Sequence, residues 1–334
     1  MAVKVAINGF GRIGRLVFRH VMDNDALDLV AVNDAAPLDN LLYLLKFDST
    51  QKIPDVPIQM KARSFTFGGK EVAFTSTRDP ADLLWEEIGV ELVIESTGRF
   101  TDREGASKHL QAGAKRVLIT APSKDADRTI CLGVNEDAYD PENDHIVSNA
   151  SCVTNCVLPV AKVLDEHFGI VTGILTTIQA YTHSQGIVDS PNRDWRRGRA
   201  AALSLVPTST GAVETIVKVL PQLDGKIGSM AIRAPIPAGS LIDFKVHSEK
   251  PVSVDSVNRA LCNAANSSKM KGILGTSNDE LVSADIIGCS YSALVDLKST
   301  IVVGNHDLKV LAWYDNEWGY ALRCADLADF IAGR

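Results

Sequence analysis

The sequence lacks the features of a membrane-bound, secreted or nucleic-acid-binding chain. Its 334 residues contain no apolar run long enough to cross a bilayer, and the amino-terminal residues do not form a signal-peptide pattern. Acidic residues outnumber basic ones by 41 to 34, so the net charge of −7 does not favour nucleic acid as a partner. The six cysteines include no CxxC pair and are too few for a disulfide framework in a chain of this length. We therefore expect a reduced, cytoplasmic protein that binds no metal, membrane or nucleic acid.

The amino-terminal residues carry a pattern that is typical of a dinucleotide site. Residues 3–7 (VKVAI) predict a strand, and residues 12–23 have helical periodicity. Between them, Gly9, Gly11 and Gly14 would allow a tight turn and let the backbone approach a pyrophosphate at the helix N-terminus. A lone glycine pattern also occurs in ordinary βαβ turns. Here a second predicted strand over 27–34 ends at the acidic residue Asp34, which would bind ribose hydroxyls and repel a 2′-phosphate, so NAD is favoured over NADP.

The strand and helix patterns that follow predict a Rossmann-type parallel sheet with helices on both faces. Segments 90–97, 114–122 and 145–149 read as strands separated by helix-like segments. Thr97, Thr120 and Cys152 come just past strand ends, where ligands bind in such sheets. A chain of this length exceeds a single core, so we expect residues 1–150 to form an NAD-binding domain, with a C-terminal helix over 317–334 packed on it.

Cys152 is predicted to be a reactive thiol at the start of a helix that ends at Gly169. The positive end of the helix dipole and the unpaired N–H groups favour the thiolate, so we expect the thiol pKa to be lowered. The alternative is a small apolar residue that fills a corner between strand and helix.

The second half of the chain has a different pattern of residue types. Segments 173–182, 226–235 and 240–249 are rich in β-branched residues and predict a mostly antiparallel sheet in an α+β catalytic domain over 151–316. An irregular stretch over 183–206 lies between them, and loops of this length usually carry function or an interface.

Six motifs occur in an order that identifies a family: INGFGRIGR, ASCVTNC, AYT, DWRRGRAAA, PTSTGA and WYDNEWGY. The chain resembles phosphorylating glyceraldehyde-3-phosphate dehydrogenases over essentially its whole length. The resemblance implies that Cys152 attacks a phosphorylated aldehyde, that NAD accepts a hydride, and that inorganic phosphate releases an acyl phosphate. It assigns phosphate binding to Ser151, Val153, Thr182, Arg197, Thr210, Gly211 and Arg233. It assigns cofactor contacts to Arg12, Ile13, Asp34, Arg78, Thr120 and Asn316, beside the three glycines of the turn.

Two positions depart from the family's pattern, and both lie at the chemistry. Gln179 stands where the family has its catalytic histidine, and Val153 stands where it has a threonine after the nucleophile. Glutamine cannot take a proton near neutral pH, so we expect a reduced rate. Three explanations are open: a natural paralogue with weakened or diverted activity, an engineered change that traps an intermediate, or replacement of the missing imidazole by His183.

These observations leave two functions to compare. The first is an NAD-dependent phosphorylating aldehyde dehydrogenase. The second is a catalytically impaired NAD-binding paralogue that acts as a regulator, a scaffold or a resistance-conferring stand-in. In the resembled family the stretch over 183–206 packs against a neighbouring subunit, so we expect a homotetramer.

Overall fold

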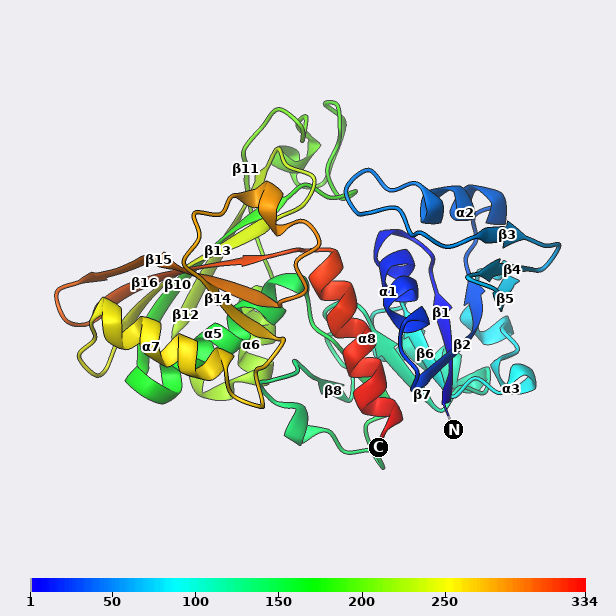
Figure 1. Cartoon of the computed structure of the whole chain (residues 1–334), viewed down its shortest axis with the longest axis horizontal. Helices are drawn as coiled ribbons and strands as arrows, with labels where there is room; N and C mark the ends of the chain where they lie inside the picture. Colours follow the sequence, from blue (N-terminus) through cyan, green and yellow to red (C-terminus); the bar gives the residue numbers. More distant parts are fainter. Residues whose placement is uncertain (1) are drawn as a thin grey trace. The chain divides into compact units, whose positions relative to one another are not determined.

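The computed structural model describes residues 2–334 and divides the chain into two compact units (Figure 1). The first unit comprises the chain up to Ile130, together with Asp137–Ala150 and Ala321–Arg334. The second comprises Cys131–Glu136 and Ser151–Tyr320. Within residues 2–334, no helix combines the length and the apolar character needed to span a bilayer.

The first unit is built on a nine-stranded sheet with the order β3-β4-β5-β2-β1-β6-β7-β9-β8. Strands β5, β2, β1, β6, β7, β9 and β8 pair in parallel, which confirms the predicted parallel sheet. Two antiparallel strands that the sequence patterns did not predict, β3 and β4, extend it at one edge. The strands are β1 (Val3–Asn8), β2 (Leu27–Asn33), β3 (Ile58–Met60), β4 (Ser64–Phe67), β5 (Lys70–Thr75), β6 (Leu92–Glu95), β7 (Arg116–Ile119), β8 (Arg128–Thr129) and β9 (Ile146–Ser148).

The helices associated with this sheet begin and end at recognisable signals. α4 starts after Asp102, whose carboxylate accepts a hydrogen bond from the Gly105 N–H at 2.8 Å. The central strand β1 is buried on both sides at Val5, Ala6 and Ile7, which explains its continuous apolar run. The elements of the first unit are α1 (Arg12–Met22), α2 (Leu38–Lys46), η1 (Pro80–Asp82), α3 (Trp85–Ile88) and α4 (Arg103–Gln111); η2 (Glu136–Ala138) and α8 (Trp318–Ala332) each contain residues of both units.

The second unit has a seven-stranded sheet with the order β11-β12-β10-β13-β16-β15-β14. The pairs β10–β12 and β14–β15 are parallel and the other four are antiparallel, which confirms the predicted mostly antiparallel sheet. Helices α5 and α7 pack together and against the sheet (Figure 1). The elements are α5 (Cys152–Phe168), β10 (Ile170–Ala180), η3 (Trp195–Gly198), β11 (Val206–Thr208), α6 (Ala212–Val219), η4 (Pro221–Leu223), β12 (Ile227–Ala234), β13 (Ser240–Ser248), α7 (Val254–Ala265), β14 (Leu274–Ser277), η5 (Ser283–Ile286), β15 (Ala293–Val303) and β16 (Asp307–Tyr314).

Residues 181–205, between β10 and β11, contain no helix or strand except the short turn η3 (Figure 1). Several large apolar side chains on this loop are exposed, including Trp195 at 88% and Leu203 at 85%. A loop that leaves such side chains in water is a candidate interface.

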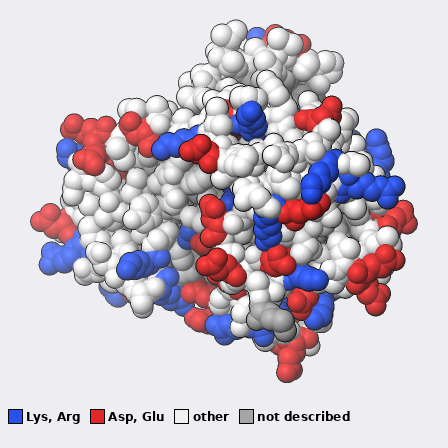
Figure 2. All heavy atoms as spheres, turned by 45° about the vertical axis from the view of Figure 1, so that its right-hand side comes forward, with Lys and Arg blue, Asp and Glu red and all other residues white. Residues whose placement is uncertain are grey.

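Charged side chains of both signs lie beside one another on the face shown in Figure 2. The surface ion pairs of the chain include Lys115 with Glu91 and Lys61 with Glu71, both at 2.7 Å. Such exposed pairs contribute little to the free energy of folding, so the two cores carry the stability.

Candidate active site

The glycine turn of the first unit has the shape that a dinucleotide site requires. Gly9 has φ of 93°, and a Cβ there would lie 2.6 Å from Thr97 N. A Cβ on Gly14 would lie 2.0 Å from Gly9 O, so the protein's own packing requires glycine at both positions. A Cβ on Gly11 would meet no described atom within 4 Å. The open position just before α1 therefore suits a pyrophosphate that approaches the backbone and the helix N-terminus.

Asp34 follows β2 and its carboxylate is oriented by two backbone donors. Oδ2 accepts from Phe10 N–H at 2.6 Å and Oδ1 from Ala36 N–H at 2.8 Å. Each oxygen keeps a further lone pair that can accept from a ribose hydroxyl. The preceding residue, Asn33, donates to Asn8 Oδ1 at 2.7 Å and so joins the ends of β2 and β1.

Arg12 lies at the first position of α1, where the sequence placed a cofactor contact. Its guanidinium forms an ion pair with Asp48 and a hydrogen bond with Thr50. Burial alone would raise the pKa of the Asp48 carboxyl, but hydrogen bonds from Arg12 and from the Gln51 and Thr50 N–H groups hold this pKa below its usual value. Arg12 is therefore fixed next to the glycine turn by a carboxylate of its own unit.

Three further predicted cofactor residues belong to the same unit. Ile13 lies in the first turn of α1, Arg78 is exposed after β5, and Thr120 follows β7. The Thr120 hydroxyl donates to the carbonyl of Glu95 at 3.1 Å, at the end of the neighbouring strand. Their contacts with NAD stay predictions.

Cys152 is the first residue of α5, and the start of this helix is capped by its neighbours. Ser151 Oγ accepts from Thr154 N–H at 3.3 Å, while Thr154 Oγ1 accepts from Ser151 N–H at 2.8 Å. Ala150 has φ of 56°, the only left-handed non-glycine residue in the described chain, so the backbone turns sharply before the helix. The Ser151 hydroxyl, predicted to bind phosphate, thus also serves the helix cap.

The expectation of a lowered thiol pKa is wrong for this chain. Burial raises the pKa of Cys152 to about 11, although the positive charge of Arg233 and the N–H of Val153 act in the opposite direction. The helix N-terminus is present, but desolvation of the partly exposed thiol outweighs it.

Gln179 and Arg233 are neighbours across the parallel pair β10–β12. Gln179 is buried, and its Nε2 donates to Thr177 Oγ1 at 2.8 Å. Arg233 Nη1 donates to the carbonyl of Ala180 at 3.0 Å, and its guanidinium acts electrostatically on Cys152. We call Cys152, Gln179 and Arg233 the thiol cluster. His183, by contrast, lies beyond the end of β10 with an exposed side chain.

Arg197 lies within electrostatic range of Arg233, a member of the thiol cluster. Its Nε donates to Thr208 Oγ1 at 2.9 Å and lies 3.4 Å from an oxygen of Asp194. Burial is the main cause that lowers the pKa of Arg233, and the charge of Arg197 adds to it. Two guanidinium groups within electrostatic range of each other suit a ligand with two negative charges.

The remaining predicted phosphate ligands lie on segments next to these elements. Val153 is buried in the first turn of α5. Thr182 follows β10, and its hydroxyl lies 2.8 Å from that of Ser184. Thr210 Oγ1 accepts from the Ala212 N–H at 3.3 Å, and Gly211 is the residue before α6. Their roles in phosphate binding stay predictions.

Asn316 follows β16 in the second unit and is oriented by a residue that the sequence patterns did not single out. Ser240 Oγ accepts from Ala180 N–H at 3.1 Å and bonds Asn316 Oδ1 at 2.9 Å. Ser240 is buried at the start of β13, and a serine there carries no sequence signal beyond its place at a strand end. Glu95 and His109 were also missed, because their partners come from distant parts of the chain.

The glycine turn of the first unit is typical of a dinucleotide-binding oxidoreductase, and the second unit carries a thiol at a helix start with Arg233 within electrostatic range. Residues 3–103 match the family model of the glyceraldehyde 3-phosphate dehydrogenase NAD binding domain, and residues 151–316 match that of its C-terminal domain. The chain belongs to the glyceraldehyde 3-phosphate dehydrogenase family, and its cofactor is NAD.

Proteins named glyceraldehyde-3-phosphate dehydrogenase are similar to the chain from end to end. The protein of Geobacillus stearothermophilus is 51% identical over 334 residues, covering 100% of this chain and 99% of the relative. Those of Priestia megaterium (100% and 99% covered) and Streptomyces coelicolor (100% of both) are each 48% identical.

Proposed function

We propose that the chain oxidises glyceraldehyde 3-phosphate, with NAD and inorganic phosphate, to an acyl phosphate. The proposal rests on Cys152 at the start of α5, with Arg233 within electrostatic range, in a chain that belongs to this family along its length. Gln179 and Val153 would make the reaction slow rather than abolish it.

The chemistry follows from the groups of the second unit. The Cys152 thiolate adds to the aldehyde carbon, and the carbonyl oxygen takes up a proton to give a hemithioacetal. Bound NAD would accept the hydride, and loss of the hydroxyl proton leaves a thioester on sulfur. A phosphate oxygen then attacks the thioester carbon and the thiolate leaves. Arg233 and Arg197 would bind the two phosphate groups.

Gln179 would affect the first two steps. Its amide can orient a hydroxyl by hydrogen bonds but cannot remove the proton. General acid–base assistance is worth about 10²–10⁴-fold, which sets the scale of the expected loss. The thiol pKa of about 11 adds to it, because few molecules carry the thiolate near neutral pH.

The alternative is an NAD-binding paralogue that acts as a regulator, a scaffold or a resistance-conferring stand-in. Gln179, Val153 and the raised thiol pKa favour it. The two paired arginines favour the enzyme, since a binding protein needs no anion site beside a thiol.

Stopped-flow measurement of NADH formation, with and without phosphate, separates these functions. Sustained NADH formation that requires phosphate supports the proposed enzyme. A burst of about one NADH per subunit without turnover places the defect at acyl release. Absence of any NADH at substrate saturation, with NAD bound, selects the paralogue.

We further propose a homotetramer in the cytoplasm. The loop over 181–205 exposes Trp195 and Leu203, which would be covered by a neighbouring subunit. None of the six cysteines, all of which lie within the described residues, forms a disulfide, which suits a reducing compartment. Four chains of 36.0 kDa give roughly 144 kDa, and light scattering at micromolar concentration tests this mass. A mass near one chain would refute the tetramer.

A further inference from the structure

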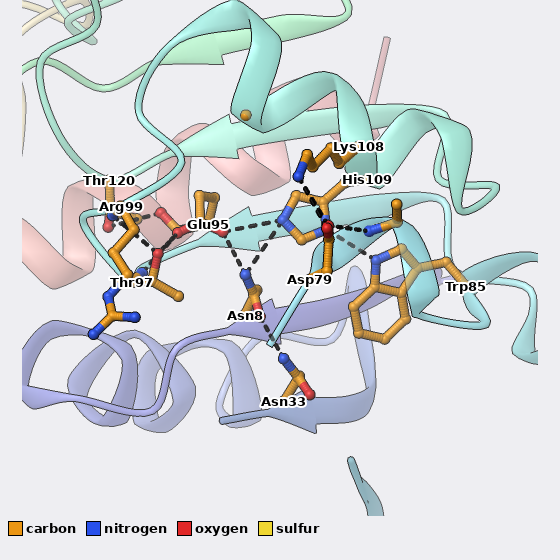
Figure 3. Close-up of polar contacts among 12 residues, drawn as sticks. Asn8, Asn33, Asp79, Trp85, Glu95, Thr97, Arg99, Lys108, His109 and Thr120 are labelled. Atoms are coloured by element: carbon orange, nitrogen blue, oxygen red, sulfur yellow. Dashed lines mark hydrogen bonds and ion pairs between the residues drawn. The ribbon is translucent and has the colours of Figure 1, made fainter. Parts of the chain in front are cut away.

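A buried polar network lies next to the glycine turn and takes no part in the chemistry proposed above. Its centre is the carboxylate of Glu95, which is 1% exposed at the end of β6. Oε1 accepts from the N–H (2.7 Å) and the hydroxyl of Thr97, and Oε2 accepts from Asn8 Nδ2 (2.5 Å) and lies 3.0 Å from His109 Nε2 (Figure 3). One carboxylate therefore joins β1, the loop after β6, and α4.

The proton on His109 is placed by a second neighbour. Trp85 Nε1 lies 3.0 Å from His109 Nδ1, and both side chains are buried (Figure 3). An indole N–H can only donate, so Nδ1 accepts and carries no proton. The single proton of the neutral imidazole is then on Nε2, which donates to Glu95. Trp85 thus sets the direction of the hydrogen bond between His109 and Glu95.

The Glu95 carboxylate accepts hydrogen bonds from residues on both sides of a close backbone contact at the glycine turn. A Cβ on Gly9 would lie 2.6 Å from Thr97 N and 2.8 Å from the carbonyl carbon of Ser96. Ser96 N–H donates to Asn8 O at 2.7 Å, on the residue just before the turn. Because Glu95 binds Thr97 on one side and Asn8 on the other, it fixes the spacing between the turn and the loop after β6.

We propose that Glu95 is a positioning residue for the dinucleotide site, and that Trp85 restricts His109 to the tautomer that donates to Glu95. The inference rests on NAD binding by the first unit. It assigns to Glu95 an effect on NAD affinity that acts through the backbone of the glycine turn.

The amide isostere tests the carboxylate directly. In Glu95→Gln one oxygen accepts and the other position becomes an N–H donor, which faces either the N–H and hydroxyl of Thr97 or, on the other side, the N–H groups of Asn8 and His109. His109 could accept from this donor only as its other tautomer, and its Nδ1–H would then face the Trp85 N–H. A donor that faces a donor inside a protein is costly, so we expect NAD affinity to fall about tenfold. Removal of the indole N–H relieves the part of this conflict that involves His109, while the Asn8 amide still faces the new donor.

The experiment measures NAD binding by isothermal titration calorimetry for the wild type, Glu95→Gln, Trp85→Phe and the double variant. We expect Trp85→Phe alone to change NAD affinity less than threefold and the double variant to bind NAD more tightly than Glu95→Gln. The control is Glu91→Gln, an exposed carboxylate of the same unit that pairs with Lys115 at 2.7 Å. Its NAD affinity should equal that of the wild type.

A second measurement needs no substitution at the site. Long-range ¹H–¹⁵N correlation spectra of the wild-type imidazoles, with His109→Gln used for assignment, should show His109 as the neutral Nε2–H tautomer. An Nδ1–H tautomer or an imidazolium overturns the proposal. So does wild-type NAD affinity in Glu95→Gln, even where its melting temperature falls, since that marks a role in stability alone. Equal affinity of the double variant and Glu95→Gln removes the link through Trp85. Failure of the wild type itself to bind NAD contradicts the cofactor assignment instead.

Discussion

Substitution of Gln179 by histidine tests the proposed chemistry most directly. With a thiol pKa of about 11, roughly one Cys152 in a thousand is ionised at pH 8. An opposite charge within about 4–6 Å lowers a pKa by about 1–3 units, so an imidazolium at position 179 would raise the thiolate fraction about 10- to 1,000-fold. The imidazole can also remove the hemithioacetal proton. We therefore expect the redox step to accelerate by about 10²-fold or more.

A histidine at position 179 would keep the local hydrogen-bond partner. Gln179 is a β10 residue beside Arg233, and the Thr177 hydroxyl that now accepts from its amide can accept from an imidazole N–H. Most predicted cofactor contacts, including the glycine turn, belong to the other unit, and Asn316 lies after β16 rather than on β10, so NAD affinity should change little. Rapid mixing that follows NADH measures the rate, and Gln179→Met, which has similar length but no polar group, is the control. The reasoning is refuted if Gln179→His leaves the rate unchanged. If His183→Ala in the wild type also abolishes the reaction, His183 is the base.

The remaining predictions concern phosphate, the turn, the thiol and the cofactor. Val153→Thr in the Gln179→His background should chiefly strengthen the phosphate dependence of acyl release, by about 1 kcal/mol, measured as the KM for phosphate. Gly11→Ala should weaken NAD binding in calorimetry without lowering the melting temperature, whereas Gly14→Ala, with its clash at 2.0 Å, should destabilise the fold. The rate at which iodoacetamide alkylates Cys152, followed by mass spectrometry, should rise about tenfold per pH unit from pH 7 to 10. The reason is that the reactive thiolate forms only as the pH approaches about 11. A plateau of this rate near pH 8 would contradict the prediction. NAD should bind at least tenfold more tightly than NADP, since Asp34 repels a 2′-phosphate, and comparable affinities in calorimetry would refute this role.

The parts of the fold that depend on local pattern could be predicted from the sequence. The buried strand β1 and the glycines after it gave the dinucleotide turn, and the apolar period after Cys152 gave α5, which ends at Phe168 before Gly169. The antiparallel edge β3–β4 escaped prediction, because its strands have only three and four residues, and the alternation in β4 is too short to distinguish a strand from a loop.

The parts of the site that depend on desolvation could not be predicted in this way. The sequence correctly predicted that Cys152 begins α5. It predicted a lowered thiol pKa, however, and the pKa is raised, because burial depends on elements distant in the sequence. The same holds for Glu95, whose donors come from β1 and from α4, 87 and 14 residues away. A sequence pattern locates a chemical group, whereas the free energy of its charged form depends on all that surrounds it.

The free energy of the thiolate, rather than the location of Cys152, is what Gln179 affects. A helix N-terminus and one arginine do not bring the Cys152 thiol below its unperturbed pKa, so a larger thiolate fraction in this chain requires a further positive charge or a base at the thiol. Glutamine supplies neither, while it keeps a hydrogen bond to Thr177 and thus the local packing of β10. The substitution therefore separates binding from chemistry: the arginines and the dinucleotide turn can hold their ligands, and the rate depends on the small thiolate population that burial permits.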